Sequence, residues 1–228
     1  MLNTQLILVA KKPSKGTGKQ RIAADIGADN ACQLAEALLD CALEDLRQWP
    51  GPVSVLIARA KDASWARQQI PRAAVATQAA GNLGDRLSAG WHALVPTDSP
   101  AMMIGSDCPE LDLAYLSRCA ESLTRADVVL GLAEDGGVVV MGARVDWPAL
   151  HDLPWSQSNL ATALRARCEA HGLTLEVHPA LSDIDSASQL QPLAKMLASD
   201  VRPARQALRR RLIHLIPQHD LAMSRSTG

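Results

Sequence analysis

Short apolar runs and longer segments with helical spacing of apolar residues follow each other along the chain, and this order predicts a sheet covered by helices. Short apolar runs without internal alternation are typical of parallel strands that are buried on both faces. Such runs predict strands at residues 5–10, 53–58, 101–105, 127–133, 138–143 and 174–179, with a weaker strand at 73–78.

Segments of helical periodicity separate these strands. The clearest is residues 28–48, in which the apolar positions share one face. That face consists of Ala31, Leu34, Ala35, Leu38, Leu39, Ala42, Leu43 and Leu46, and we interpret it as core. Further helices are predicted at 62–69, at 112–123 and at 160–171. Another follows the turn at 79–87 and ends at about residue 94, and a last one begins at residue 186. This alternation indicates an α/β fold, a three-layer α/β/α sandwich with a mostly parallel sheet.

Composition narrows the class of protein. The chain is 47% hydrophobic, lacks Phe and has a net charge of −1, which favours an aliphatic core and argues against a general nucleic-acid or membrane binder. Five scattered cysteines without a CxxC pair indicate neither a disulfide framework nor a zinc site. Without a signal peptide or membrane-spanning run, we predict a reduced, cytoplasmic protein.

Candidate chemistry begins where the strand at 101–105 ends. Pro109 stops the ladder of backbone hydrogen bonds, and Asp112 is placed to cap the next helix. Asp107 lies between them, at the carboxyl end of a strand, where open α/β sheets bind ligands. It either binds a phosphate-bearing cation or forms a turn.

Two glycine-containing segments follow other strands. Residues 11–22 carry five cations and two glycines, which suits either phosphate binding or a solvated basic loop, and they lack the Walker pattern. In the second segment, residues 79–87, Arg86 lies in a first helical turn, where the helix dipole disfavours a cation. It therefore indicates an anionic partner or a local salt bridge.

Acidic residues follow two further strands. Glu134 and Asp135 precede a Gly pair, so they form either a hairpin turn or a pair of site carboxylates. Asp183 and Asp185 point the same way if their segment is extended, and could then face a cation. In a loop they could equally cap a helix.

The C-terminal tail, residues 198–228, is set apart from a domain at 1–197. Residues 203–216 predict a basic amphipathic helix, which docks on its own domain or on a second subunit, with membrane-surface binding as the less favoured alternative. Residues 223–228 are predicted to be disordered.

Together, a basic loop and several carboxylates at strand ends could bind a diphosphate with a divalent metal, because the carboxylates hold the cation and the basic side chains neutralise the phosphates. The motifs that carry them are Ala10, Lys11, Pro13, Gly16, Lys19 and Arg21; then Gln78, Gly81, Leu83, Gly84 and Arg86; then GSDCPEL at 105–111, DGG at 135–137, Trp155-Ser156, and Asp183, Asp185 and Ser186. In this order, from residue 6 to about 193, the sequence resembles the DUF2064 family of the GT-A glycosyltransferase superfamily, related to 2-phospholactate and molybdenum-cofactor guanylyltransferases. It departs from the family at Val138 and Val139, where aromatic residues are usual.

The resemblance implies a nucleotide-diphospho-sugar transferase fold with bound Mg²⁺ or Mn²⁺. It implies that Asp107, Asp183 and Asp185 bind the metal, and that Asp107 and Asp135 are catalytic, with Asp135 facing the sugar or acceptor. The residues implied to bind the nucleotide are Lys11, Gly16, Lys19, Arg21, Gln78, Gly84 and Arg86.

Three functions are consistent with this resemblance. The first is a metal-dependent glycosyltransferase that uses a nucleotide sugar and an unknown small-molecule acceptor. The second is a nucleotidyltransferase that joins an NTP to a phosphorylated acceptor, and the third is a catalytically degraded nucleotide-binding protein, suggested by the missing aromatic residues. The protein could be a homodimer, and deletion of residues 202–228 is expected to leave nucleotide affinity intact.

Overall fold

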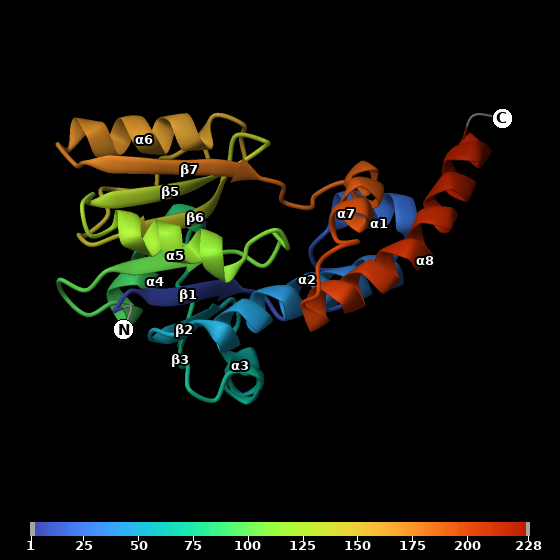
Figure 1. Ribbon diagram of the computed structural model, residues 1–228, viewed down its shortest axis with the longest axis horizontal. Helices are drawn as coiled ribbons and strands as arrows, with labels where there is room; N and C mark the ends of the chain where they lie inside the picture. The colour runs from blue at the N-terminus through green and yellow to red at the C-terminus, as the bar shows by residue number, and fades with distance from the viewer. Residues whose placement is uncertain (1–2, 227–228) are drawn as a thin grey trace.

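The computed structural model describes residues 3–226 of the chain, with side-chain surroundings described up to residue 215. Within these residues one sheet of seven strands forms the centre of the fold (Figure 1). In sheet order the strands are β3 (Ala74–Thr77), β2 (Val53–Ile57), β1 (Gln5–Ala10), β4 (Ala101–Ile104), β6 (Val138–Ala143), β5 (Val128–Ala133) and β7 (Leu175–Leu181).

The sheet is mostly parallel, as expected. Strands β1, β2, β3 and β4 pair in parallel, and so do β5 and β7. Strand β6 runs antiparallel to both of its neighbours, because the turn at 134–137 returns the chain directly from β5. That turn is therefore a hairpin, and Asp135 in it also lines the cleft described below, so the two predicted alternatives hold together for this residue.

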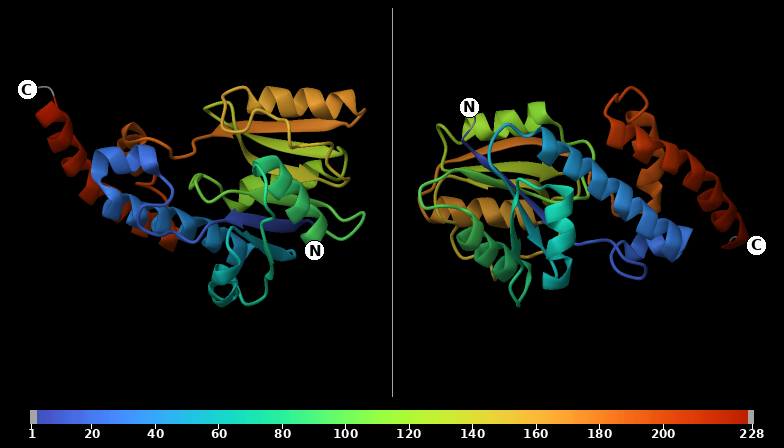
Figure 2. Two further views of the ribbon diagram at one scale, coloured as in Figure 1. Left: turned by 180° about the vertical axis from the view of Figure 1, so that it is seen from behind. Right: turned by 90° about the horizontal axis from the view of Figure 1, so that it is seen from below.

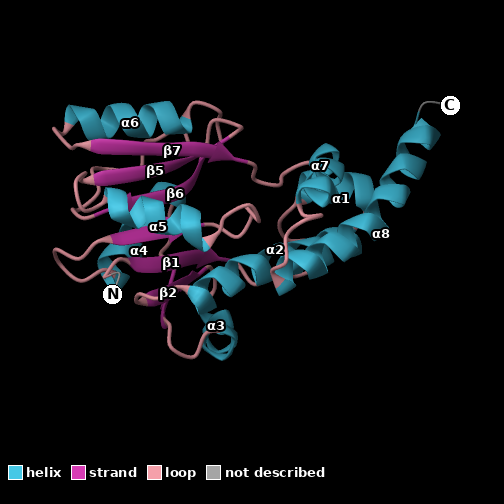
Figure 3. Cartoon of the chain, in the orientation of Figure 1, coloured by secondary structure: helices cyan, strands magenta, loops and turns pink. Residues whose placement is uncertain are grey.

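Helices cover both faces of the sheet, which confirms the three-layer sandwich (Figure 3). On one face lie α2 (Ala28–Gln48), α3 (Ala63–Gln69) and α5 (Leu113–Ser122). On the other face lie α4 (Leu83–Leu94) and α6 (Leu160–Ala170). Single 3₁₀ turns, η1 (Ala60–Asp62) and η2 (Ala187–Gln189), precede α3 and α7. Asp112 caps α5 as predicted, since its side chain accepts a hydrogen bond of 2.6 Å from the backbone N–H of Tyr115.

A second group of helices stands at one end of the molecule (Figures 1 and 2). It consists of α1 (Gln20–Ile26), α7 (Leu190–Met196), α8 (Pro203–Ser226) and the first half of α2. Helix α2 joins the two parts because Leu34 and Leu38 are buried in the helical core, whereas Leu43 and Leu46 are buried against the sheet. The apolar face predicted on this helix thus serves two cores.

Two segments differ from the sequence prediction. Residues 11–22 were expected to be a loop, but α1 begins at Gln20 because Ile22 and Ile26 are buried in the helical core. Helix α8 continues through Pro217 to Ser226, although disorder was predicted from residue 223. Residues 218–226 contain neither Gly nor Pro, and Leu221, Ala222 and Met223 among them favour a helix. Residues 227 and 228 lie outside the described part of the chain.

The strand order fixes where a ligand can bind. From β1 the chain adds β2 and β3 on one side and then returns to add β4 on the other. Such a reversal opens a crevice at the carboxyl ends of the two central strands. Along the described residues, no helix combines the length and the apolar character needed to cross a bilayer.

Candidate active site

A cleft of about 530 Å³ opens beside the carboxyl ends of β1 and β4. It gathers many of the residues singled out in the sequence, although they come from distant parts of the chain. Its lining residues are Lys19, Gln20, Arg21, Leu83, Asp107, Asp135, Gly137, Val138, Ser156, Leu160, Asp183 and Asp185.

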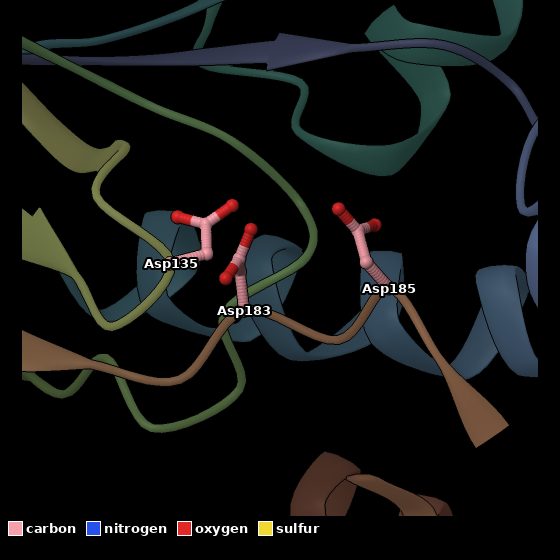
Figure 4. A group of neighbouring side chains, drawn as sticks. All are labelled: Asp135, Asp183 and Asp185. Atoms are coloured by element: carbon pink, nitrogen blue, oxygen red, sulfur yellow. The ribbon is translucent and has the colours of Figure 1, made fainter. Parts of the chain in front are cut away.

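Three carboxylates meet in this cleft. One oxygen from each of Asp135, Asp183 and Asp185 lies within 4.8 Å of the others. Figure 4 shows Asp135 on the turn between β5 and β6, and the other two on the segment that follows β7. The backbone N–H of Gly137 holds Asp135 in place through a 2.8 Å hydrogen bond to its Oδ1 atom. Asp135, expected on the acceptor side, therefore lies with the two carboxylates expected to bind metal.

The electrostatics of this cluster suit a cation. Burial, reinforced by the negative charges of Asp135 and Asp185, raises the pKa of Asp183 to about 6. A divalent cation would relieve that repulsion, and carboxylate oxygens are the ligands that Mg²⁺ and Mn²⁺ prefer. The residues present thus fit the predicted metal.

Lys19 already supplies one positive charge to the cleft. Its Nζ atom lies 3.1 Å from Asp107 Oδ2 and 3.1 Å from Asp185 Oδ1, and it also donates to the carbonyl of Ile184. Only 7% of the side chain is exposed. The backbone at Lys19 is left-handed, with φ of +49°, a strained conformation that these side-chain contacts hold in place.

Asp107 is tied to the acidic segment through its backbone as well. Its carbonyl accepts a 3.0 Å hydrogen bond from the N–H of Ile184, which fixes the distance between the end of β4 and Asp183 and Asp185. Next to it, burial raises the pKa of Cys108 to about 12. The thiol is therefore protonated at neutral pH, and this cysteine is not an activated nucleophile.

Five predicted nucleotide-binding residues lie outside the set that lines the cleft. Lys11 and Gly16 are exposed on the loop after β1. Gln78 donates to the carbonyl of Leu56, and Arg86 Nε donates to the carbonyl of Gly81 at 2.8 Å. Arg86 thus makes a local contact, but this contact is a hydrogen bond to a backbone carbonyl before α4 and not the predicted salt bridge.

Gly84 has a packing role in this structure. A Cβ atom on it would lie 2.1 Å from the carbonyl oxygen of Leu150 and 2.7 Å from the indole nitrogen of Trp155. Gly136 is likewise confined, because its φ is +89° and a Cβ atom would lie 1.8 Å from the carbonyl of Ser158. Both glycines let the segment at 150–159 pack closely against the start of α4 and the turn between β5 and β6.

Six lining residues had no predicted role in the site. Gln20 stands between Lys19 and Arg21, so its position beside two predicted phosphate ligands was an available signal. Leu83, Gly137, Val138 and Ser156 lie in or beside the quoted family motifs, which was the signal for them. Leu160 gave no signal, because an apolar residue in a first helical turn is normally interpreted as core.

Solved structures similar to this chain share its fold. A protein of Desulfovibrio desulfuricans G20, provisionally named a nucleotide-diphospho-sugar transferase, is 20% identical, with a TM-score of 0.84 over 95% of this chain and 97% of that one. A cytidylyltransferase from Leptospira borgpetersenii serovar Hardjo-bovis is 14% identical, with a TM-score of 0.51 over 97% and 96%. CMP:2-keto-3-deoxy-manno-octonic acid synthetase in complex with CTP is 10% identical, with a TM-score of 0.51 over 87% and 100%.

The nucleotide-diphospho-sugar transferase fold implied by the sequence is thereby confirmed. No curated protein matches the chain significantly. A family model does match residues 42–157, which include the Asp107 motif, the DGG turn and Trp155-Ser156, whereas the basic loop and the Asp183 segment lie outside that range. The chain therefore belongs to the DUF2064 family, described as uncharacterized protein conserved in bacteria.

Proposed function

We propose that the protein is a metal-dependent glycosyltransferase that uses a nucleotide-diphosphate sugar as donor. One observation carries the proposal: three carboxylates whose oxygens lie within 4.8 Å of one another share a cleft with Lys19 and Arg21. This combination suits a diphosphate, whose negative charge requires both a cation and basic side chains. The fold shared with the Desulfovibrio protein supports the same donor class.

The residues of the cleft have distinct parts in this proposal. Asp135, Asp183 and Asp185 would hold Mg²⁺ or Mn²⁺, which supplies the charge that stabilises a departing nucleoside diphosphate. Arg21, which is exposed on the cleft wall, binds a phosphate oxygen. Asp107 orients Lys19 through their ion pair and offers a further carboxylate to the metal or to the reacting hydroxyl.

A nucleotidyltransferase is the second candidate. Two of the similar solved structures are named for cytidylyl or CMP transfer, and the same charges would serve attack on the α-phosphorus of an NTP. A degraded site is less well supported, because the implied carboxylates, Lys19 and Arg21 all line one cleft.

The decisive experiment is a calorimetric titration of UDP, GDP, CDP and their triphosphates, in Mn²⁺ and in EDTA. We expect one nucleotide to bind only with metal, and Asp185→Asn to weaken that binding at least tenfold. The matched control is Asp146→Asn, since this carboxylate is exposed and lies far from the cleft on the loop after β6. Metal-independent binding, or equal losses in the two variants, would contradict the proposal.

The released product then separates the two transferases. A glycosyltransferase breaks the bond between the sugar and the diphosphate and releases a nucleoside diphosphate. A nucleotidyltransferase releases pyrophosphate from an NTP and an acceptor. Nucleotide binding without turnover of any donor would favour the degraded site.

A further inference from the structure

An apolar hollow of about 200 Å³ adjoins the charged cleft. The two share Leu83, Val138, Ser156 and Leu160 along their common rim, so they lie side by side. The remaining walls come from β1, α4, β4, β6 and the segment before α6. These are Val9, Leu87, Met103, Ile104, Gly105, Val139, Met141 and Trp155.

The walls of the hollow are chemically uniform. Ser156 contributes the only hydroxyl among the lining side chains that the structure describes. The indole N–H of Trp155 is already satisfied by the carbonyl of Leu150, at 2.8 Å, so the ring offers only apolar surface. A nucleobase placed here would leave several polar groups without side-chain partners, which costs free energy. A saturated hydrocarbon group has no polar atoms, so it would lose no hydrogen bonds on entering the hollow.

The hollow lies where this sequence departs from the family pattern. Val138 and Val139 line it at the two positions where the family pattern has aromatic residues. The side chain of Val139 packs in the core on the other face of the sheet, whereas Val138 packs with the residues around the hollow. An aromatic ring at position 138 would take up space that the valine leaves open.

We propose that this hollow binds a saturated hydrocarbon group of the acceptor, of about six carbon atoms, while the polar end of the acceptor remains in the charged cleft. The size follows from volume, since a cavity of about 150 Å³ holds one benzene molecule. This inference rests on the proposed transferase function, and it specifies the acceptor as an amphiphilic molecule.

The test uses n-alkyl monophosphates from methyl to octyl, titrated calorimetrically in Mn²⁺. The phosphate is held by the charges of the cleft and the alkyl chain enters the hollow. Each added methylene should tighten binding about fourfold until the hollow is full, near six carbons, and then the gain should stop. Inorganic phosphate serves as the zero point of the series.

Val138→Tyr should abolish the dependence on chain length, because its ring fills the hollow. Val9→Tyr is the second variant: Val9 lines the hollow but not the charged cleft, so the affinity for inorganic phosphate should remain unchanged in this variant. Val201→Tyr, at an 89% exposed position outside the hollow, adds the same ring and should change nothing.

Nucleotide binding, measured on the same samples, separates the two proposals. If a nucleotide binds with Mn²⁺ but affinity is the same at every alkyl length, the hydrocarbon site is wrong and the transferase proposal stands. A length dependence that persists in both tyrosine variants would also overturn the site. If neither nucleotide nor alkyl phosphate binds, both proposals fail together.

Discussion

At the scale of single residues, Lys19 is the most informative position in the cleft. The sequence implied that it binds phosphate, and the structure places its ammonium group between Asp107 and Asp185. An ammonium and a divalent cation would compete for the same carboxylate oxygens. Lys19 is therefore expected to have opposite effects on the metal and on the nucleotide.

We predict that Lys19→Met strengthens the binding of Mn²⁺ alone severalfold, because the variant leaves Asp107 and Asp185 without their positive partner. The same variant should weaken nucleotide binding in saturating Mn²⁺ by about tenfold, because one charge that offsets the phosphates is lost. Calorimetry of Mn²⁺ and then of the nucleotide measures both effects. Lys15→Met is the control, since Lys15 is exposed and paired with Asp29. Weaker Mn²⁺ binding in Lys19→Met would show that the lysine supports the metal site.

At the scale of elements, the start of α8 is tied to the loop that presents Asp107. Arg205 is fully buried, and its guanidinium donates to the carbonyls of Pro109 at 3.2 Å and Leu111 at 2.8 Å. It also pairs with Glu44 at 3.0 Å and Asp45 at 2.5 Å on α2. Arg205 thus joins α2, α8 and the loop after β4 through buried hydrogen bonds.

We predict that Arg205→Met lowers the free energy of unfolding by about 3–5 kcal/mol, because buried Glu44 loses its cation and buried Asp45 keeps only Arg202, at 3.5 Å. Urea denaturation measures the change. Adding Glu44→Gln and Asp45→Asn to the variant should recover a substantial part of the loss, since the uncompensated charges are then gone. If the triple variant is as unstable as the single one, the loss comes from the backbone carbonyls that Arg205 satisfies.

At the scale of the whole molecule, the helical end is continuous with the site. Leu208, Leu212 and Leu215 of α8 are buried in one core with Ile22 of α1. The same core includes Ile184, which lies between the two aspartates of the acidic segment. Residues from both ends of the chain therefore hold the loops that carry Lys19 and Asp185.

This packing changes the expectation for the C-terminal deletion. Removing residues 202–228 takes away Arg205 and the buried leucines, so we now predict lower thermal stability and at least tenfold weaker nucleotide binding. Removing only residues 217–228 should preserve both properties, because the buried leucines remain. Thermal unfolding and nucleotide titration of the two truncated proteins make the comparison. If the chain ending at residue 201 binds nucleotide like the full chain, the helical end is independent of the site.

The sequence by itself determined most of the elements and the location of the chemistry. Helix α2 and strand β1 have the predicted bounds, and Asp112 caps α5 as expected, because these features depend on periodicity and on hydrogen bonds between near neighbours. The polar residues after β1 and β4 were identified because parallel strands bring their carboxyl ends to one edge.

Only the tertiary structure decided which of those polar residues meet. Asp135 lies beside Asp183 because β5 pairs with both β6 and β7, and Lys19 reaches Asp107 because α1 packs on the helical core. Likewise, the hollow behind Val138 exists only where five elements converge. Periodicity reports which face of an element is buried, but the partner of each buried or charged group depends on strand order and packing across the whole chain, which no local pattern encodes.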